Sequence, residues 1–227
     1  MSMQKFQFIA LILVFSGLSL SAQDFHYGIS GGLDIAHIRT DLETRDLYEN
    51  DINLMSHYNS ILTYNINASL RYKIDNTWGI SLEPGYVRKG VAIHYDINDL
   101  PDYDILLDYL QLPVLLDVYA TDRLSFSAGP SIELLLFAKE KPDNQFVSLN
   151  SFYNKNLEFA LMAGAAYQIT EMVGVGIRYN RSLTAGREYE LRDMQLHPLG
   201  HVTEYNHYFQ LFFRFNFSPS KQESKEE

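Results

Sequence analysis

The segment ILTYNINASLRYKIDNTWGISLEPGYV, residues 61–87, decides the fold. From Leu62 to Ile74 every second residue is apolar, and the residues between them are polar. A turn at 75–77 follows, and the alternation resumes from Trp78. Alternation with a period of two residues predicts β-strands, which the turn joins as a hairpin. Both strands exceed the ~5–6 residues usual in globular sheets. One apolar face opposite one charged face is typical of a wall between lipid and a polar lumen.

The same alternation predicts six more strands, which with the hairpin make eight. The six lie at 26–38, 109–119, 124–136, 157–169, 173–180 and 207–217. Short turns alternate with long polar segments, which cover 39–59, 91–108, 139–155 and 186–203. Brief periplasmic turns and long external segments are typical of outer-membrane barrels. We therefore predict an all-β fold, an eight-stranded antiparallel up-and-down transmembrane β-barrel over residues 23–217. A soluble β-sandwich is the alternative, although it does not require this alternation of connections.

Composition excludes several classes of protein. The chain has 227 residues, 46% of them hydrophobic and 14% aromatic. Beyond the N-terminus no apolar run reaches the ~18 residues that a membrane helix needs. The absence of cysteine excludes a lipoprotein anchor, a disulfide framework and thiol catalysis. The net charge of −10, without a basic patch, argues against binding to nucleic acid.

The two ends of the chain differ from the rest in composition. Residues 1–22 predict a secretory signal, with Lys5 before an apolar core at 8–20 and cleavage after Ala22. A permanent membrane anchor is the alternative, but its apolar core is too short. The polar tail at 218–227 is predicted to be disordered.

Several short motifs follow one another along the mature chain. They are YGISGGL at 27–33, LEPGYVRKG at 82–90, YLQLPVLL at 109–116, AGP at 128–130 and RY at 178–179. In order and spacing they resemble the PorT-like outer-membrane β-barrel family, which is common in Bacteroidetes. The resemblance implies an eight-stranded barrel in the cell outer membrane. It implies no active site, although the family takes its name from a member tied to protein secretion.

The inward face of the predicted barrel carries charged residues. They are Arg71, Lys73, Glu83, Asp117, Glu133, Glu158, Arg178 and Arg214. The interior of an eight-stranded barrel is just wide enough to be filled by side chains, and an unpaired charge there is costly. We therefore interpret these residues as a salt-bridged polar plug, which argues against a general diffusion porin. A narrow ion path is the alternative.

Aromatic residues near the strand ends, on or beside the apolar face, predict girdles at the two membrane interfaces. They are Tyr72, Trp78, Tyr86, Tyr119, Tyr167 and Tyr179.

Two groups of residues carry the atoms that metal ions prefer. Oxygen ligands for calcium occur at Asp96, Asn98, Asp99, Asp102 and Asp104, but their spacing does not match an EF-hand. His197 and His201, near Glu204 and His207, have a spacing that binds zinc on a helix. Pro198 and Gly200 break any such helix, so we interpret both groups as solvated external segments.

A lipid A-modifying enzyme is a further alternative, because such barrels use a histidine with a serine or glutamate at the outer rim. The residues that would supply these groups are Ser182, Glu188, His197 and His201. They form no motif, so we assign no catalytic, cofactor-binding or metal-binding residue.

The sequence therefore predicts a non-enzymatic integral outer-membrane protein. We expect a monomeric barrel that contacts outer-membrane lipid and lipopolysaccharide, and an envelope protein partner through its long external segments. The alternatives are an accessory of a protein-secretion apparatus and a lipid A-modifying enzyme.

Overall fold

The computed structural model describes residues 25–44, 57–94, 102–142, 146–153, 155–192 and 198–217. The predicted signal segment 1–22 and the predicted tail 218–227 lie outside these residues. The elements are β1 (Phe25–Thr44), β2 (His57–Asn59), β3 (Ile61–Lys73), β4 (Trp78–Leu82), β5 (Gly85–His94), β6 (Tyr103–Tyr119), β7 (Leu124–Pro142), β8 (Val147–Ser148), the 3-10 helix η2 (Asn150–Phe152), β9 (Leu157–Gln168), β10 (Val173–Ser182), β11 (Arg187–Arg192) and β12 (Pro198–Phe217). Within the described residues, no helix is long and apolar enough to cross a membrane.

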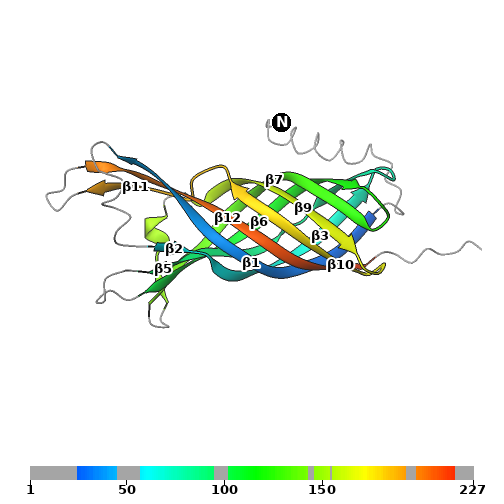
Figure 1. Ribbon diagram of the computed structural model, residues 1–227, viewed down its shortest axis with the longest axis horizontal. Helices are drawn as coiled ribbons and strands as arrows, with labels where there is room; N and C mark the ends of the chain where they lie inside the picture. The colour runs from blue at the N-terminus through cyan, green and yellow to red at the C-terminus, as the bar shows by residue number, and fades with distance from the viewer. Residues whose placement is uncertain are drawn as a thin grey trace, which may run out of the picture.

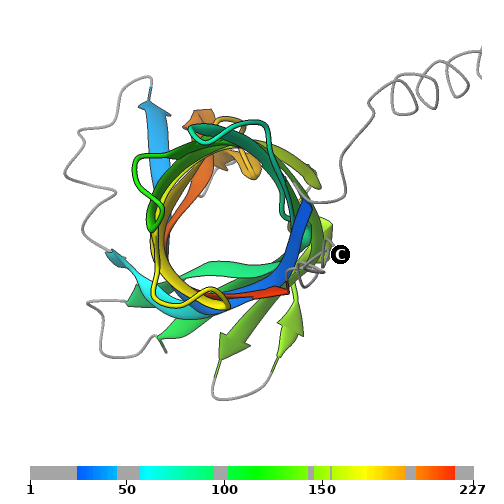
Figure 2. The same ribbon diagram turned by 90° about the vertical axis from the view of Figure 1, so that its right-hand side faces the viewer.

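The strands close into one antiparallel ring (Figures 1 and 2). Around the wall the order is β1, β3, β4 with β5, β6, β7, β9, β10 and β12, which pairs with β1 again. The predicted eight-stranded barrel is therefore confirmed. β4 and β5 act as one wall strand, because Leu82 pairs with Val114 and Gly85 with Gln111 in the same register. The break between them lies at Pro84, which has no backbone N–H to donate to the ladder.

Side chains alternate between the two faces of the wall as the period of two requires. On β3, Leu62 and Ile66 are exposed on the outer surface, whereas Asn65 and Asn67 are buried in the interior. Glycine permits close packing of β1 against β12: a Cβ atom on Gly32 would lie 1.9 Å from the carbonyl oxygen of Leu211. A hydrophobic outer band and a polar interior suit a barrel in lipid.

Five of the predicted strand limits are wrong, because strands continue into segments that we expected to be loops. β1 runs on to Thr44, β5 continues to His94, β6 begins at Tyr103, β7 reaches Pro142 and β12 begins at Pro198. Beyond the membrane the outward face of a strand meets water. Polar residues there no longer distinguish a strand from a loop, although the backbone ladder continues.

These continuations form two sheets that project past the barrel wall (Figures 1 and 2). The first extension consists of the outer parts of β1 and β12 together with β11, residues 39–44, 187–192 and 198–206. The second extension consists of the outer parts of β5, β6 and β7 with β2 and β8, residues 57–59, 90–94, 103–108, 137–142 and 147–148.

Candidate functional site: the barrel interior and its outer mouth

An ionic cluster fills the interior near the short turns. Glu83 accepts hydrogen bonds from Arg178 and from Arg214, each at 2.8 Å, so both carboxylate oxygens carry a guanidinium partner. All three side chains are buried. Two cations on one carboxylate leave a local excess of positive charge, and the carboxylate of Asp117, which is also buried on this face, interacts electrostatically with Arg214.

The ring of Phe212 lies between the two arginines of this cluster. The guanidinium carbons of Arg178 and Arg214 lie 4.8 and 5.2 Å from the ring centroid. Gly176 makes room for the ring, because a Cβ atom there would lie 2.4 Å from its Cζ atom. Cation–π contacts of this kind hold the two guanidinium planes where Glu83 can accept from both.

A second ionic cluster lies further towards the outer mouth, around Lys89. The ammonium group forms ion pairs with Glu133 and, at 3.5 Å, with Glu158, and all three side chains are fully buried. Asn180 donates to Glu133 at 2.8 Å, and Ser182 donates to Glu158 at 2.6 Å. One cation therefore serves two carboxylates, and neutral donors satisfy the oxygens that remain.

A chain of side-chain hydrogen bonds crosses the interior beside these clusters. Asn65 donates to Asp34 at 2.8 Å, Asn67 to Asn65 at 3.1 Å, and Gln111 to Asn67 at 2.6 Å. The hydroxyl of Tyr208 then donates to Gln111 at 2.9 Å. Because these residues come from β1, β3, β6 and β12, the chain of bonds links four strands of the wall.

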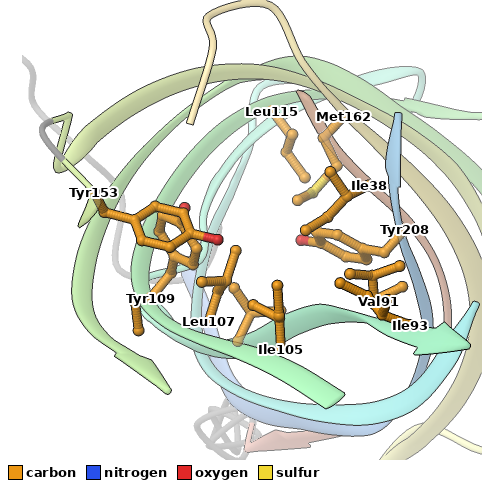
Figure 3. Packing of buried hydrophobic residues seen from close by; sticks show 13 residues of the cluster. Ile38, Val91, Ile93, Ile105, Leu107, Tyr109, Leu115, Tyr153, Met162 and Tyr208 are labelled. Carbon is orange, nitrogen blue, oxygen red and sulfur yellow. The ribbon is translucent and has the colours of Figure 1, made fainter. Parts of the chain in front are cut away.

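The outer part of the interior is apolar, which the sequence analysis did not anticipate. Figure 3 shows the rings of Tyr153 and Tyr208 entering the lumen from opposite sides, above aliphatic side chains of β5 and β6. The buried cluster is formed by Ala36, Ile38, Val87, Val91, Ile93, Ile105, Leu107, Tyr109, Leu115, Ala138, Tyr153, Met162 and Tyr208. The inward face is therefore polar in the inner part and apolar towards the mouth.

The segment around η2 closes this apolar cluster from above. Asn150 accepts a hydrogen bond from the backbone of Ala138 at 2.7 Å, and the backbone of Leu149 donates to Ala138 at 2.8 Å. These two bonds fix the segment to β7 and place Tyr153 in the mouth of the barrel, where it is buried.

Arg187 and Glu204 meet beside Tyr153 at the base of the first extension. Their charged groups lie 3.8 Å apart, and the guanidinium stacks on Tyr153 and Tyr189 at 5.6 and 4.4 Å from the ring centroids. Burial raises the pKa of Glu204, while Arg187 and a hydrogen bond from Tyr189 act in the opposite direction. This group ties β11, β12 and the η2 segment together.

The structure buries most of the predicted inward charges in the two ionic clusters and their surroundings. Arg71 and Lys73 lie instead at the inner end and are half-buried; Arg71 donates to Asn216 at 3.3 Å, and Lys73 stacks on Tyr119. Sequence analysis missed Asp34, Lys89 and Glu204. Lys89 could have been found by counting, because it lies six residues beyond Glu83 and therefore on the same face of a continuous strand.

The residues considered for lipid A chemistry are not brought together. Ser182 is buried in the lumen against Glu158, whereas His201 is exposed on the other face of β12. Glu188 is exposed and pairs with Lys155 at 2.5 Å. His197 lies outside the described residues. This dispersal gives no geometry for a nucleophile and its base.

The residues considered for metal binding also lie apart wherever the structure describes them. Glu204 points inward and His201 and His207 lie on the opposite face of β12, while Asp102 pairs with His94 at 2.6 Å. Asp96, Asn98 and Asp99 lie outside the described residues. Across the described ranges, no three histidine or acidic residues form a group that could hold a metal ion.

Two of the predicted girdle residues, Trp78 and Tyr167, are exposed on the outer surface near the inner ends of β4 and β9. Tyr179 stacks on Phe209 with ring centroids 4.7 Å apart. Tyr86 instead donates to Asp108, and Tyr119 lies near the lumen at the inner end, where Lys73 stacks on it.

A family comparison matches residues 21–185 to the outer membrane protein β-barrel domain. The chain belongs to this family. Its members are barrels of the outer membrane, and the outer membrane is where this barrel resides. Among curated proteins, none matches the sequence.

Solved outer-membrane barrels resemble the chain at low identity. The attachment invasion locus protein Ail of Yersinia pestis is 17% identical, with 86% of this chain and 99% of that chain covered and a TM-score of 0.44. Neisserial surface protein A is 14% identical, with 87% and 98% covered and a TM-score of 0.44. The translocator domain of the autotransporter NalP from Neisseria meningitidis is 13% identical, with 94% and 96% covered and a TM-score of 0.35. These likenesses say nothing about what this chain binds.

Proposed function

We propose that the chain is a non-enzymatic, monomeric outer-membrane barrel that presents its two extensions to a protein partner of the envelope. The observation that carries this proposal is the continuation of β1, β6, β7 and β12 past the apolar band as hydrogen-bonded sheet. A barrel that acts only within the bilayer does not require ordered strands outside the bilayer.

Free strand edges on the first extension support a partner role. Among the described residues, β11 pairs only with β12, and β1 beyond Ala36 pairs only with β12. Unpaired N–H and C=O groups on such an edge are a template for an added strand from another protein.

Exposed aromatic side chains support the same role near the second extension. Phe146 and Phe152 expose 61% and 59% of their surface, and Val147 between them exposes 49%. Large apolar side chains exposed to water are typical of protein-binding sites.

The filled interior supports a binding role rather than a transport role. Lys89, Glu133 and Glu158 are buried within one cluster, and the apolar cluster lies between them and the outside. An ion passing through would have to break these pairs and then cross a hydrocarbon-lined section.

The finer family assignment is also a proposal. The motifs LEPGYVRKG and YLQLPVLL, separate in sequence, lie side by side in β4–β5 and β6, with Gly85 opposite Gln111 and Tyr86 opposite Leu110. This adjacency supports a PorT-like member, and with it the second candidate function, an accessory of a protein-secretion apparatus.

Site-specific photo-crosslinking in living cells tests the partner role. A crosslinker replaces His201 on the first extension or Phe152 near the second, both of which are exposed. Tyr103 is a poorer position, because it packs against the apolar cluster. Thr121, in an exposed turn at the opposite end, serves as the matched control.

We expect one protein, in a fixed ratio, at an outer position and not at Thr121. Capture of a large envelope assembly would favour the secretion accessory. Equal capture at all three positions, or no protein at either outer position, would contradict the proposal.

A further inference from the structure

A row of basic side chains crosses the outward face of three neighbouring strands. His37 on β1 lies directly opposite His207 on β12, which in turn lies opposite Arg181 on β10. The two imidazole rings are 5.1 Å apart between centroids. Arg39 is the next outward residue on β1 and lies close enough to act electrostatically on His207. We call His37, His207, Arg181 and Arg39 the basic row.

The basic row lies at the outer edge of the apolar band. The strand row below it is apolar, with Ile35, Phe209 and Tyr179 paired across the same three strands. His37 is ten residues beyond Tyr27. At ~3.4 Å per residue and a strand tilt of ~40°, this distance is about 25 Å along the barrel axis, which is the height of the band in such barrels. The basic row therefore lies at the level of lipid headgroups in the outer leaflet.

The two arginines of the basic row differ in their partners. Arg39 pairs with Asp41 at 2.7 Å and stacks on Tyr205. Arg181 lies opposite Leu161 on one side and His207 on the other, and no carboxylate of the described residues pairs with it. The Nδ1 atom of His37 is buried and has no hydrogen-bond partner among the described residues.

A second group of outward cations, Arg88 and Lys139, is neutralised by a carboxylate of the protein itself. Arg88 binds Asp108 through two hydrogen bonds, at 2.7 and 3.2 Å, and Lys139 reaches the same carboxylate at 3.4 Å. Asp108 faces outward but is buried by these partners. Arg181 of the basic row has no such carboxylate partner among the described residues.

We propose that the basic row binds the phosphate group of a lipid headgroup in the outer leaflet. Arginine binds phosphate through paired N–H donors, and imidazole N–H groups add donors on the same row. The apolar strand row below the site, with Ile35 and Phe209, provides a surface for the acyl chains of the same lipid. The phosphate comes from lipid A or from a phospholipid.

Native mass spectrometry of the full-length protein in neutral detergent tests this proposal. The added lipids are phosphorylated lipid A, the same lipid A without its phosphates, and phosphatidylglycerol; inorganic phosphate is tested separately. The variant is H37Q/H207Q/R181Q, and the matched control is R123Q, which removes one exposed cation at the inner end. An unboiled SDS gel first shows whether each protein migrates as folded. We expect all of them to fold, because all four substitutions lie on exposed or half-buried positions.

We expect phosphorylated lipid to be retained by the wild type and by R123Q. The triple variant should retain at least about fivefold less, because the loss of Arg181 alone removes ~1 kcal/mol of attraction to a lipid surface, and two imidazole donors are lost with it. Retention of lipid A alone identifies its phosphates as the source, whereas retention of phosphatidylglycerol as well identifies any phosphorylated lipid. Equal retention of dephosphorylated lipid A, an undiminished triple variant, or binding of inorganic phosphate without lipid would overturn the proposal. H207R keeps an N–H donor at this position and should preserve retention, which distinguishes the loss of donors from the loss of packing.

Discussion

At the scale of single residues, the ion pairs of the two interior clusters join side chains from different strands. Lys89 comes from β5, Glu133 from β7 and Glu158 from β9. Desolvation makes a buried pair a weak source of stability, but removing one partner leaves the other charge uncompensated, which is strongly destabilising. The network therefore acts more on which strands can be neighbours than on total stability.

The variant K89M should lower the free energy of unfolding by about 3–5 kcal/mol, because two buried carboxylates lose their cation. Urea unfolding in lipid vesicles, followed by the fluorescence of the single tryptophan, Trp78, measures the loss. The control K73M removes a half-buried lysine that stacks on Tyr119 and should cost about 1 kcal/mol or less. K89M/E133Q should recover part of the stability. If K89M were as stable as K73M, the interior cluster would not be formed.

At the scale of elements, the depth of an outward residue sets the cost of charging it. Ile66 on β3 lies opposite Gly31, midway along the band, whereas Leu70 lies opposite Tyr27, near its inner end. I66R should therefore destabilise the barrel by ~2–4 kcal/mol and L70R by less, approaching ~0–1 kcal/mol at the interface. The same urea titration measures both variants. Equal costs would show that this strand does not cross the bilayer at the depth inferred here.

The first extension has its own dependence on pH through Glu204. Burial raises the pKa of this carboxyl in the folded state, so the folded chain binds the proton more tightly than the unfolded chain. The stability of the extension should therefore fall as pH rises from the unfolded pKa to the folded one, and remain constant above it. Hydrogen exchange of β11 and β12 between pH 4 and 8 measures this effect. E204Q should remove the pH dependence; an unchanged profile in E204Q would assign it to another group.

At the scale of the whole molecule, a closed and filled barrel should resist denaturation by detergent and should not conduct ions. We expect the folded protein to resist SDS and to change its migration after boiling. In planar bilayers it should give no stepwise conductance, whereas a porin in the same bilayers does. Regular ohmic steps from the wild type would show that the interior clusters leave a path for ions.

The same scale shows what sequence can and cannot predict. The eight-stranded ring follows from a period of two, because lipid outside and polar groups inside enforce it on every strand. The alternation of apolar and polar residues is lost where both faces of β5 and β6 are buried, around Val91 and Leu107. The limits of these two strands could therefore not be predicted from the pattern. The partners of Glu83, 95 and 131 residues away, depend on closure of the ring and carry no local signal.

Those long separations have a consequence for how the protein is made. Arg214 on β12 can meet Glu83 only when the last strand reaches the first part of the wall, so the ion pairs form late. Until then these charges remain hydrated, and each would oppose entry of an open, partly paired sheet into lipid. Contacts of such high sequence separation also make folding slow. Closure of the ring and insertion into the bilayer should therefore occur as one concerted event, with the counter-ions acting as a checkpoint against premature entry.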